Sequence, residues 1–214
     1  TGTGVLPRAM ARFGAQFTGI DASENQIAQA RRLTAEAGLA IDYHVRTAED
    51  TGLGAHCFDA VTACQCFWYF DKSKVFPEIR RLLKSNGKLA ILSMAWLPGE
   101  SEIAQKSEAL ILKYNPDWTG AGYQRFTPRK PDWADTYGFT PVHLDGFDVQ
   151  IPFTRETWHG RMKACRGAAA SLSETQLQNF ERDHVQMLEQ IAPKQFDIPH
   201  FVAMLIFEIG IAGA

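Results

Sequence analysis

The chain has 214 residues, and 45% of them are hydrophobic, which is enough for one α/β domain with a sizeable core. Its 22 basic and 24 acidic residues give a net charge of −2, so we expect a small-molecule partner and no nucleic acid. The four cysteines lack the C-x-x-C spacing of zinc sites, and no apolar run is long enough to cross a membrane, so we expect no metal, no membrane partner and a cytoplasmic location.

The first part of the chain alternates strands with helices. The segment TGTG at residues 1–4 leads directly into helix-like sequence, and we expect that a first strand belongs before it and is missing from this chain. Ser23 and Gln26 have the spacing of a capping box, which predicts a helix that begins there and stops at Gly38. The hydrophobic pattern predicts strands at residues 17–21, 41–45, 58–63 and 88–94, and a further helix at 75–83.

The pattern changes after Trp96. Residues 97–138 contain many prolines and aromatic side chains and one predicted helix, so we interpret them as a lid insertion between a core of residues 1–96 and a C-terminal part of the core, residues 139–214. The last part is predicted to contain a strand at 142–153, helices at 155–166 and 174–191, and a strand at 200–209. The predicted fold is therefore α/β and Rossmann-like, with a mostly parallel sheet and an antiparallel C-terminal edge strand.

Two glycines and one acid carry the first functional signal. Gly2 and Gly4 precede a helix, and glycine lets the backbone approach a ligand closely. Asp21 ends the next predicted strand, where a carboxylate can accept both hydroxyls of a ribose. The arrangement predicts nucleotide binding at the carboxyl ends of parallel strands, although glycines alone also occur in ordinary tight turns.

In order and spacing, residues 1–95 resemble the class I S-adenosylmethionine-dependent methyltransferases, specifically small-molecule enzymes of the methyltransferase type 11 kind. TGTG at residues 1–4 is similar to the second half of their first motif, D-x-G-x-G-x-G. The further matching segments are IDAS at 20–23, TAED at 47–50, FDAV at 58–61, ACQC at 63–66, RLLK at 81–84 and NGK at 86–88.

This resemblance implies S-adenosyl-L-methionine as the cofactor. Thr47 stands where many relatives have an aspartate that binds the adenine amino group, so Glu49 or a backbone carbonyl takes that role. A nicotinamide dehydrogenase is the competing interpretation, but Pro7 stands where its G-x-G-x-x-G fingerprint requires glycine. The implied cofactor-binding residues are Gly2, Gly4, Asp21, Ala22, Ala48, Glu49, Cys64 and Gln65.

The segment CQCFWYFD at residues 64–71 follows the predicted fourth strand, where the transferred methyl group should emerge. Phe67 and Phe70 are interpreted as core residues, and Trp68 as a substrate contact. The segment is similar to the Q-x-x-H-W-F stretch of small-acid methyltransferases of the trans-aconitate type, with Trp68 in the histidine position. Cys64 is not expected to be a covalent nucleophile, because methyl transfer needs none.

The predicted helix 155–166 mixes arginines with apolar side chains on one face. Such a face suits a pocket wall for an anionic, partly apolar substrate, or a solvated helix with a tryptophan anchor. We assign the catalytic roles to His159, Arg161 and Arg166, and substrate contacts to Trp158 and to Tyr123 of the insertion. The insertion also carries Trp118 and Arg125 around Gly120–Gly122, where glycines permit a mobile flap or a plain surface loop.

The sequence thus predicts a methyltransferase that acts on a small, anionic molecule. A carboxylate acceptor needs a cation to hold it, whereas a phenol or amine needs a base, for which His159 and Tyr123 are the candidates. A methyltransferase-like binding protein without catalysis is the alternative. The sequence identifies neither the acceptor atom nor the oligomeric state.

Overall fold

A computed structural model describes residues 1–209 of the chain. These residues form two compact units. The first unit contains residues 1–93 and 128–145 and continues from residue 204, and the second contains residues 94–127 and 146–203. This division differs from the three parts expected from the sequence, because most of the predicted insertion shares a unit with the helices that follow residue 154.

The first unit opens with helix α1 (Val5–Met10) and a small parallel sheet of β1 (Thr18–Asp21) and β2 (Asp42–Val45). Helix α2 (Glu24–Glu36) connects the two strands and begins where its cap predicts, because the Ser23 side chain accepts the Gln26 N–H at 3.4 Å. Gly38 ends the helix region with a positive φ of 66°. Local caps and hydrophobic periodicity therefore fix this part of the fold.

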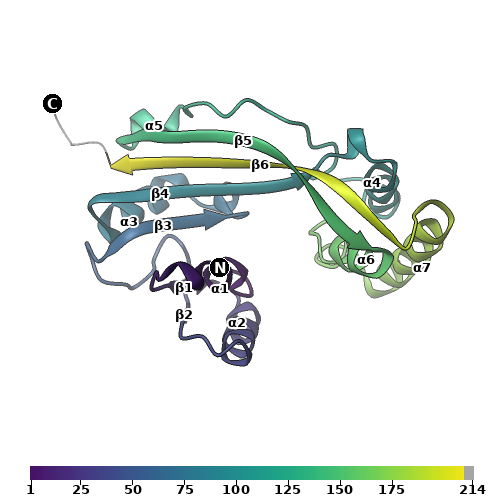
Figure 1. Cartoon of the computed structure of the whole chain (residues 1–214), viewed down its shortest axis with the longest axis horizontal. Coiled ribbons are helices and arrows are strands. Elements are labelled where there is room, and N and C mark those ends of the chain that lie inside the picture. Colours follow the sequence, from purple (N-terminus) through teal and green to yellow (C-terminus); the bar gives the residue numbers. More distant parts are fainter. Residues whose placement is uncertain (210–214) are drawn as a thin grey trace. The chain divides into compact units, whose positions relative to one another are not determined.

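A four-stranded sheet has the order β3-β4-β6-β5. Its strands are β3 (Phe58–Cys64), β4 (Leu83–Trp96), β5 (Phe139–Thr154) and β6 (Gln195–Ile209). β3 and β4 are parallel, and Figure 1 shows β6 running opposite to β4 and β5. The predicted mixed sheet with an antiparallel C-terminal strand is confirmed. The antiparallel strand β6 does not lie at the edge of the sheet. After the helices that follow β5, the chain returns and β6 pairs between β4 and β5.

The two sheets share no hydrogen-bonded strand pair within residues 1–209. Helix α3 (Lys72–Leu82) connects β3 to β4 and is capped by the Asp71 side chain, which accepts the Ser73 N–H at 3.0 Å. Its Phe76 stacks on Tyr137 and contacts Trp133 of the short helix α5 (Trp133–Thr136), so aromatic rings fill the core of the first unit.

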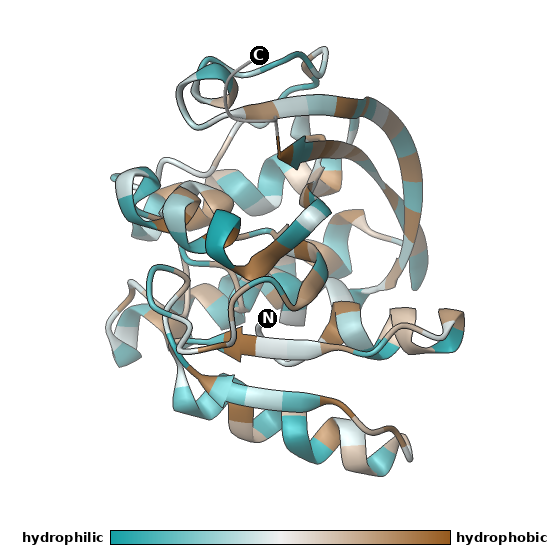
Figure 2. Ribbon diagram, turned by 90° about the vertical axis from the view of Figure 1, so that its left-hand side faces the viewer, coloured by the Kyte–Doolittle hydropathy of each residue, from teal (hydrophilic) through white to brown (hydrophobic). Residues whose placement is uncertain are grey.

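The second unit contains helices α4 (Glu102–Tyr114), α6 (Arg155–Lys163) and α7 (Glu174–Ile191). α7 contacts both other helices, and the buried side chains between them include Trp158, Phe180 and Leu188. Figure 2 shows helices banded in teal and brown, the alternation that lets one face of a helix pack on a core. Capping boxes at Thr154 and Ser173 fix where α6 and α7 begin.

The loop after α4 is anchored by a tryptophan between two glycines. A Cβ at Gly167 would lie 2.6 Å from the Trp118 ring, and a Cβ at Gly120 would lie 2.5 Å from its indole nitrogen. The Asn115 side chain also donates to the Gly167 carbonyl at 3.1 Å. These contacts tie the loop to the segment that follows α6, which ends at Lys163, before the predicted residue 166.

Candidate functional site

The glycine segment lies against the acid at the end of β1. The Asp21 carboxylate accepts the N–H of Gly2 at 2.8 Å and the N–H of Ser23 at 3.0 Å. Gly4 has a φ of 75°, and a Cβ there would lie 2.9 Å from Arg8 Nη1 and against the Tyr43 side chain, so only glycine fits. The structure therefore brings three of the predicted cofactor residues together.

Asp21 stays available to a ligand. Its side chain remains 25% exposed. Oδ2 accepts from both the Gly2 N–H and the Thr1 ammonium, at 2.8 and 3.2 Å, whereas Oδ1 accepts the Ser23 N–H and has room for a further hydrogen bond. Burial alone would raise the pKa of Asp21, but hydrogen bonds from Ser23 and Gly2, together with the charge and hydrogen bond of the Thr1 ammonium, outweigh it and hold that pKa below its ordinary value. A Cβ built at Gly2 would meet nothing closer than Gln26 Oε1 at 4.0 Å, which leaves room beside the turn. An ionised acceptor beside open backbone fits the ribose of the implied cofactor.

The segment predicted to lie beside the adenine follows β2. Ala48 packs against the core of the first unit, and Glu49 accepts the backbone N–H of Asp71 at 3.0 Å, just before α3. The Thr47 hydroxyl accepts the Asp50 N–H at 3.2 Å and closes a local turn. Glu49 therefore has a structural contact in addition to the ligand role predicted for it.

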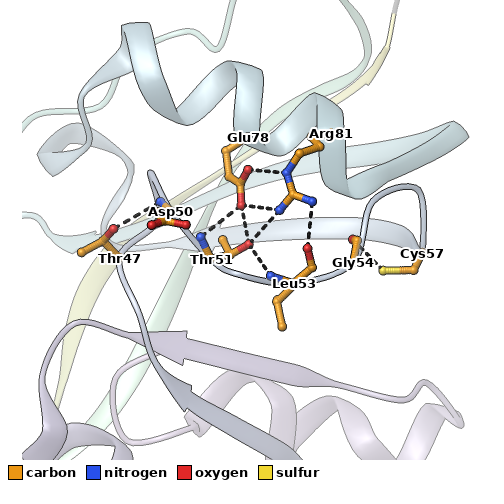
Figure 3. Close-up of polar contacts among 8 residues, drawn as sticks. All are labelled: Thr47, Asp50, Thr51, Leu53, Gly54, Cys57, Glu78 and Arg81. Atoms are coloured by element: carbon orange, nitrogen blue, oxygen red, sulfur yellow. Dashed lines mark hydrogen bonds and ion pairs between the residues drawn. The ribbon is translucent and has the colours of Figure 1, made fainter.

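An ion pair on α3 fixes the rest of this loop, as Figure 3 shows. Arg81 donates to both carboxylate oxygens of Glu78 at 2.7 Å and to the Leu53 carbonyl at 2.8 Å. Glu78 in turn accepts the backbone N–H of Thr51 at 3.0 Å and also its hydroxyl. The hydrogen bonds from Arg81 outweigh burial and lower the pKa of Glu78 to about 2. We call Thr51, Glu78 and Arg81 the loop clamp.

The end of β3 carries the predicted methyl-transfer segment. Gln65 has a positive φ of 59°, and its N–H donates to the Leu92 carbonyl at 2.9 Å, so it is held in a sparsely populated conformation. Burial raises the pKa of the Cys64 and Cys66 thiols, which disfavours the thiolate a nucleophile needs. Trp68 is 53% exposed and contacts Tyr69 edge to face, so its ring is accessible to a ligand.

The remaining predicted residues lie in the second unit, where a chain of hydrogen bonds connects its three helices. The Ser107 hydroxyl donates to the Ile103 carbonyl at 2.7 Å, and the fully buried Trp158 donates its indole N–H to Ser107 Oγ at 2.9 Å. His184 Nε2 lies 2.9 Å from the same oxygen, and His184 Nδ1 lies 2.9 Å from His159 Nδ1. Of the two interpretations of Trp158, its burial fits the tryptophan anchor.

The number of donors and acceptors determines which atom carries each proton in this series of hydrogen bonds. Because the Ser107 hydroxyl proton is given to Ile103, His184 must donate through Nε2 and accept through Nδ1. His159 then donates through Nδ1, which leaves a lone pair on its Nε2, 3.9 Å from Glu181 Oε1. Burial and the neighbouring His159 lower the pKa of His184 to about 3, and burial also lowers the pKa of His159 against the opposing effect of Glu181.

The three arginines of the predicted helix 155–166 differ in their surroundings. Arg155 donates to the Ala192 carbonyl and so connects the start of α6 to the end of α7. Arg161 lies over the Trp96 ring at 4.8 Å, and within residues 1–209 it contacts no carboxylate. Arg166 is exposed, as Arg161 is, but it lies beyond the end of α6. Arg161 is therefore the arginine of α6 whose charge is available to an anion.

One residue of this unit, Glu108, was not singled out from the sequence, whereas its neighbour Tyr123 was. Glu108 on α4 is 5% exposed and accepts the Trp96 indole N–H at 2.6 Å, and Tyr123 lines the same cavity. The signal was present, because Ala104, Glu108 and Ile111 share one helical face, which places an acid among buried residues. Within residues 1–209, no group of three or more His, Cys, Asp or Glu side chains could hold a metal ion, and no helix has the length and hydropathy of a membrane span.

Comparison with known proteins places these features in a family. Residues 1–91 match the methyltransferase domain model. A ubiquinone biosynthesis O-methyltransferase of Actinobacillus pleuropneumoniae serotype 5b is 37% identical over 171 residues, which cover 77% of this chain and 73% of that protein. The protein of that name from Xanthomonas axonopodis pv. citri is 32% identical over 120 residues, which cover 55% of this chain and only 50% of the relative.

A solved structure from Bacillus halodurans, provisionally designated a methyltransferase, shares the fold. The superposition covers 99% of this chain and 90% of the Bacillus halodurans chain, with a TM-score of 0.58 and 18% sequence identity. At that identity the likeness concerns the fold alone.

Proposed function

Because this chain belongs to the class I S-adenosylmethionine-dependent methyltransferases, we propose that it transfers a methyl group to an oxygen atom of a small, anionic molecule. The observation that carries the cofactor part is the contact between the Asp21 carboxylate and the Gly2 N–H at 2.8 Å. The oxygen acceptor is supported by the relatives, which are named O-methyltransferases.

The first unit offers the groups that S-adenosylmethionine requires. Asp21 would hold the ribose hydroxyls, and Gly2 and Gly4 would lie beside the methionine end. The loop clamp would keep the segment with Ala48 and Glu49 in place for the adenine. When bound, the cofactor supplies a methyl group on a sulfonium, which leaves as a neutral thioether when the acceptor oxygen forms the new C–O bond.

The second unit offers the groups that an anionic acceptor requires. The Arg161 guanidinium, free of carboxylates among the described residues, would hold the acceptor's negative charge. A hydroxyl acceptor must also lose a proton, and the lone pair on His159 Nε2 would accept it from a hydroxyl that reaches the α7 side of α6. His159 faces that side, because it stacks on Phe180 and His184, whereas Arg161 lies over Trp96. Glu181, which also pairs with Lys163, would stabilise the imidazolium. A carboxylate acceptor is already ionised and needs only the arginine.

Cofactor binding is tested by titration calorimetry with S-adenosylmethionine. Asp21→Ala removes charge-assisted hydrogen bonds worth roughly 1.5–3 kcal/mol each, so affinity should fall about tenfold or more. Asp42→Ala is the matched control, because Asp42 is an exposed acid on the same small sheet and should leave affinity unchanged. An unchanged affinity in folded Asp21→Ala would remove Asp21 from the site.

Acceptor binding is tested by methyl transfer to a panel of aromatic hydroxy acids. Arg161→Met should raise the acceptor KM about tenfold and leave cofactor affinity intact, since it removes a single ion pair. Arg182→Met on α7 is the control, because Arg182 is exposed and paired with Asp183. Equal KM values in both variants would refute the role of Arg161. Cofactor binding without turnover of any acceptor would favour the non-catalytic alternative.

A further inference from the structure

The second unit contains a cavity of about 790 Å³ that the proposed methyl transfer does not use. Its apolar wall includes Leu97, Ala109 and Leu112, and its polar lining includes Glu108 and Arg125. All of its lining residues lie between positions 97 and 125, so the cavity belongs wholly to the second unit. It is large enough for a small organic molecule.

Glu108 is held rigidly at this cavity. Its Oε1 accepts the Trp96 indole N–H at 2.6 Å, and its Oε2 accepts the Gly122 N–H at 2.8 Å. Two N–H donors favour the ionised carboxylate, and each oxygen retains capacity for one more hydrogen bond. A negative charge is thus fixed at the wall of the cavity by one side chain and one backbone group.

This charge has no cation beside it. Among the described residues no Lys, Arg or His nitrogen lies within ion-pair distance of Glu108, although it is only 5% exposed. Arg125, which lines the same cavity, is bound to both Glu100 and Asp148. Buried charges in proteins are usually paired, because an uncompensated ion loses its hydration without replacement. The missing cation therefore points to a ligand that brings one.

We propose that this cavity binds the ammonium group of a small organic amine, with Glu108 as its counter-ion and the apolar wall around its carbon skeleton. Among the lining residues, the carboxylates of Glu100 and Glu108 outnumber the single guanidinium of Arg125, which Glu100 and Asp148 already neutralise. Arg161, which lies over the Trp96 ring, is not a lining residue. The local charge therefore disfavours anions. Burial raises the pKa of Glu108, as expected for an acid that lacks a cationic partner. The inference does not depend on methyl transfer, since binding needs no cofactor.

The test compares three probes with one carbon skeleton: hexylamine, hexan-1-ol and hexanoate. Hexylamine, charged at pH 7.5, should bind the wild-type protein at least tenfold more tightly than the other two in titration calorimetry. Glu108→Gln should abolish this preference, and Glu102→Gln should preserve it, because Glu102 is an exposed acid on α4 paired with Lys106. Equal binding of amine and alcohol, binding of hexanoate in preference, or no amine binding would each overturn the proposal.

A second measurement covers the case in which Glu108→Gln fails to fold. The Trp96 indole N–H donates to Glu108, so its proton resonance in the wild-type protein reports directly on that carboxylate. Hexylamine should shift this resonance saturably, and hexan-1-ol should shift it much less. A resonance that responds equally to both probes would show that the cavity recognises the apolar chain alone, which contradicts the proposal.

Discussion

Glu78 in the first unit and Glu108 in the second are both nearly buried acids with opposite surroundings. The Glu78 side chain is 11% exposed and accepts hydrogen bonds from Arg81, and its pKa falls to about 2. Glu108 is 5% exposed and accepts only neutral N–H groups, and burial raises its pKa. A glutamate beside a cation, such as Glu78, thus stabilises a loop. A glutamate without a cation, such as Glu108, retains the capacity to bind a cationic ligand.

The contrast extends to the rest of each polar network. The loop clamp of the first unit is built on a charge pair, whereas the Ser107–His184–His159 chain of the second is neutral. A charge pair keeps its contribution to stability until the pH is low enough to protonate its carboxylate. A buried neutral histidine lowers the free energy of unfolding at a higher pH, because the unfolded chain protonates that histidine first. The two units should therefore respond to pH in different ways, and three experiments test this comparison.

The largest effect is expected at His184. Folded His184 stays neutral down to about pH 3, whereas the unfolded chain protonates it near 6.5, so the unfolded state binds more protons between these values. The free energy of unfolding of the second unit should therefore fall by about 1.4 kcal/mol per unit as pH drops below 6.5. Urea titrations across pH 5–7 should show this slope flattened in His184→Gln, but not in His143→Gln, whose histidine is 48% exposed.

A smaller loss is expected when the loop clamp is broken. Glu78→Gln removes a carboxylate that accepts from Arg81 and Thr51, and should lower the free energy of unfolding by about 2 kcal/mol at pH 7. The wild-type contribution is fully present above the ordinary pKa of 4.5 and is lost as pH falls through about 2. Glu36→Gln, which changes an exposed helix pair with Arg32, should cost much less in the same urea titration. A stability loss no larger than that of the control would refute the clamp.

The smallest effect, and one of opposite sign, is expected at Glu108. Because its folded pKa is raised, the folded state holds its proton longer than the unfolded chain, and wild-type stability falls as pH rises above 4.5. Glu108→Gln should remove this decline and match or exceed the wild type by up to about 1 kcal/mol at pH 8. Thermal unfolding at pH 5 and pH 8 measures it. If Glu108→Gln lowered the free energy of unfolding at pH 8 as much as Glu78→Gln does, the two glutamates would not differ in the way described.

The sequence predicted what depends on local patterns. Ser23 caps α2, and the helix predicted at residues 174–191 has the bounds of α7. Strand-end position and motif order also assigned Gly2 and Asp21 to one cofactor site, and the structure connects them by a hydrogen bond that the sequence did not predict. The cofactor side of the candidate site was therefore largely accessible from the sequence.

The acid and histidine of the second unit were missed for a physical reason. Periodicity places Glu108 and His184 on buried faces, but it does not say which residue of another helix each will meet. Ser107 contacts His184 across 77 positions of the chain, and Glu108 of α4 meets Trp96, the last residue of β4, through the side chains of both residues. Such contacts depend on how the helices pack, and the chemistry of both residues follows from those contacts.

The placement of Trp118 between Gly120 and Gly167 has a consequence for sequence variation. A methyl group at either glycine would overlap the indole, so neither position can change while the tryptophan remains. Replacement of Trp118 by a smaller residue would relieve the overlap at Gly120, whereas Gly167 would still face Ile111 Cγ2 at 2.8 Å from a Cβ. The effect of a substitution at Gly120 thus depends on the residue at position 118. A mutational library that varies one position at a time would classify Gly120 as intolerant, although it could change once Trp118 had been replaced.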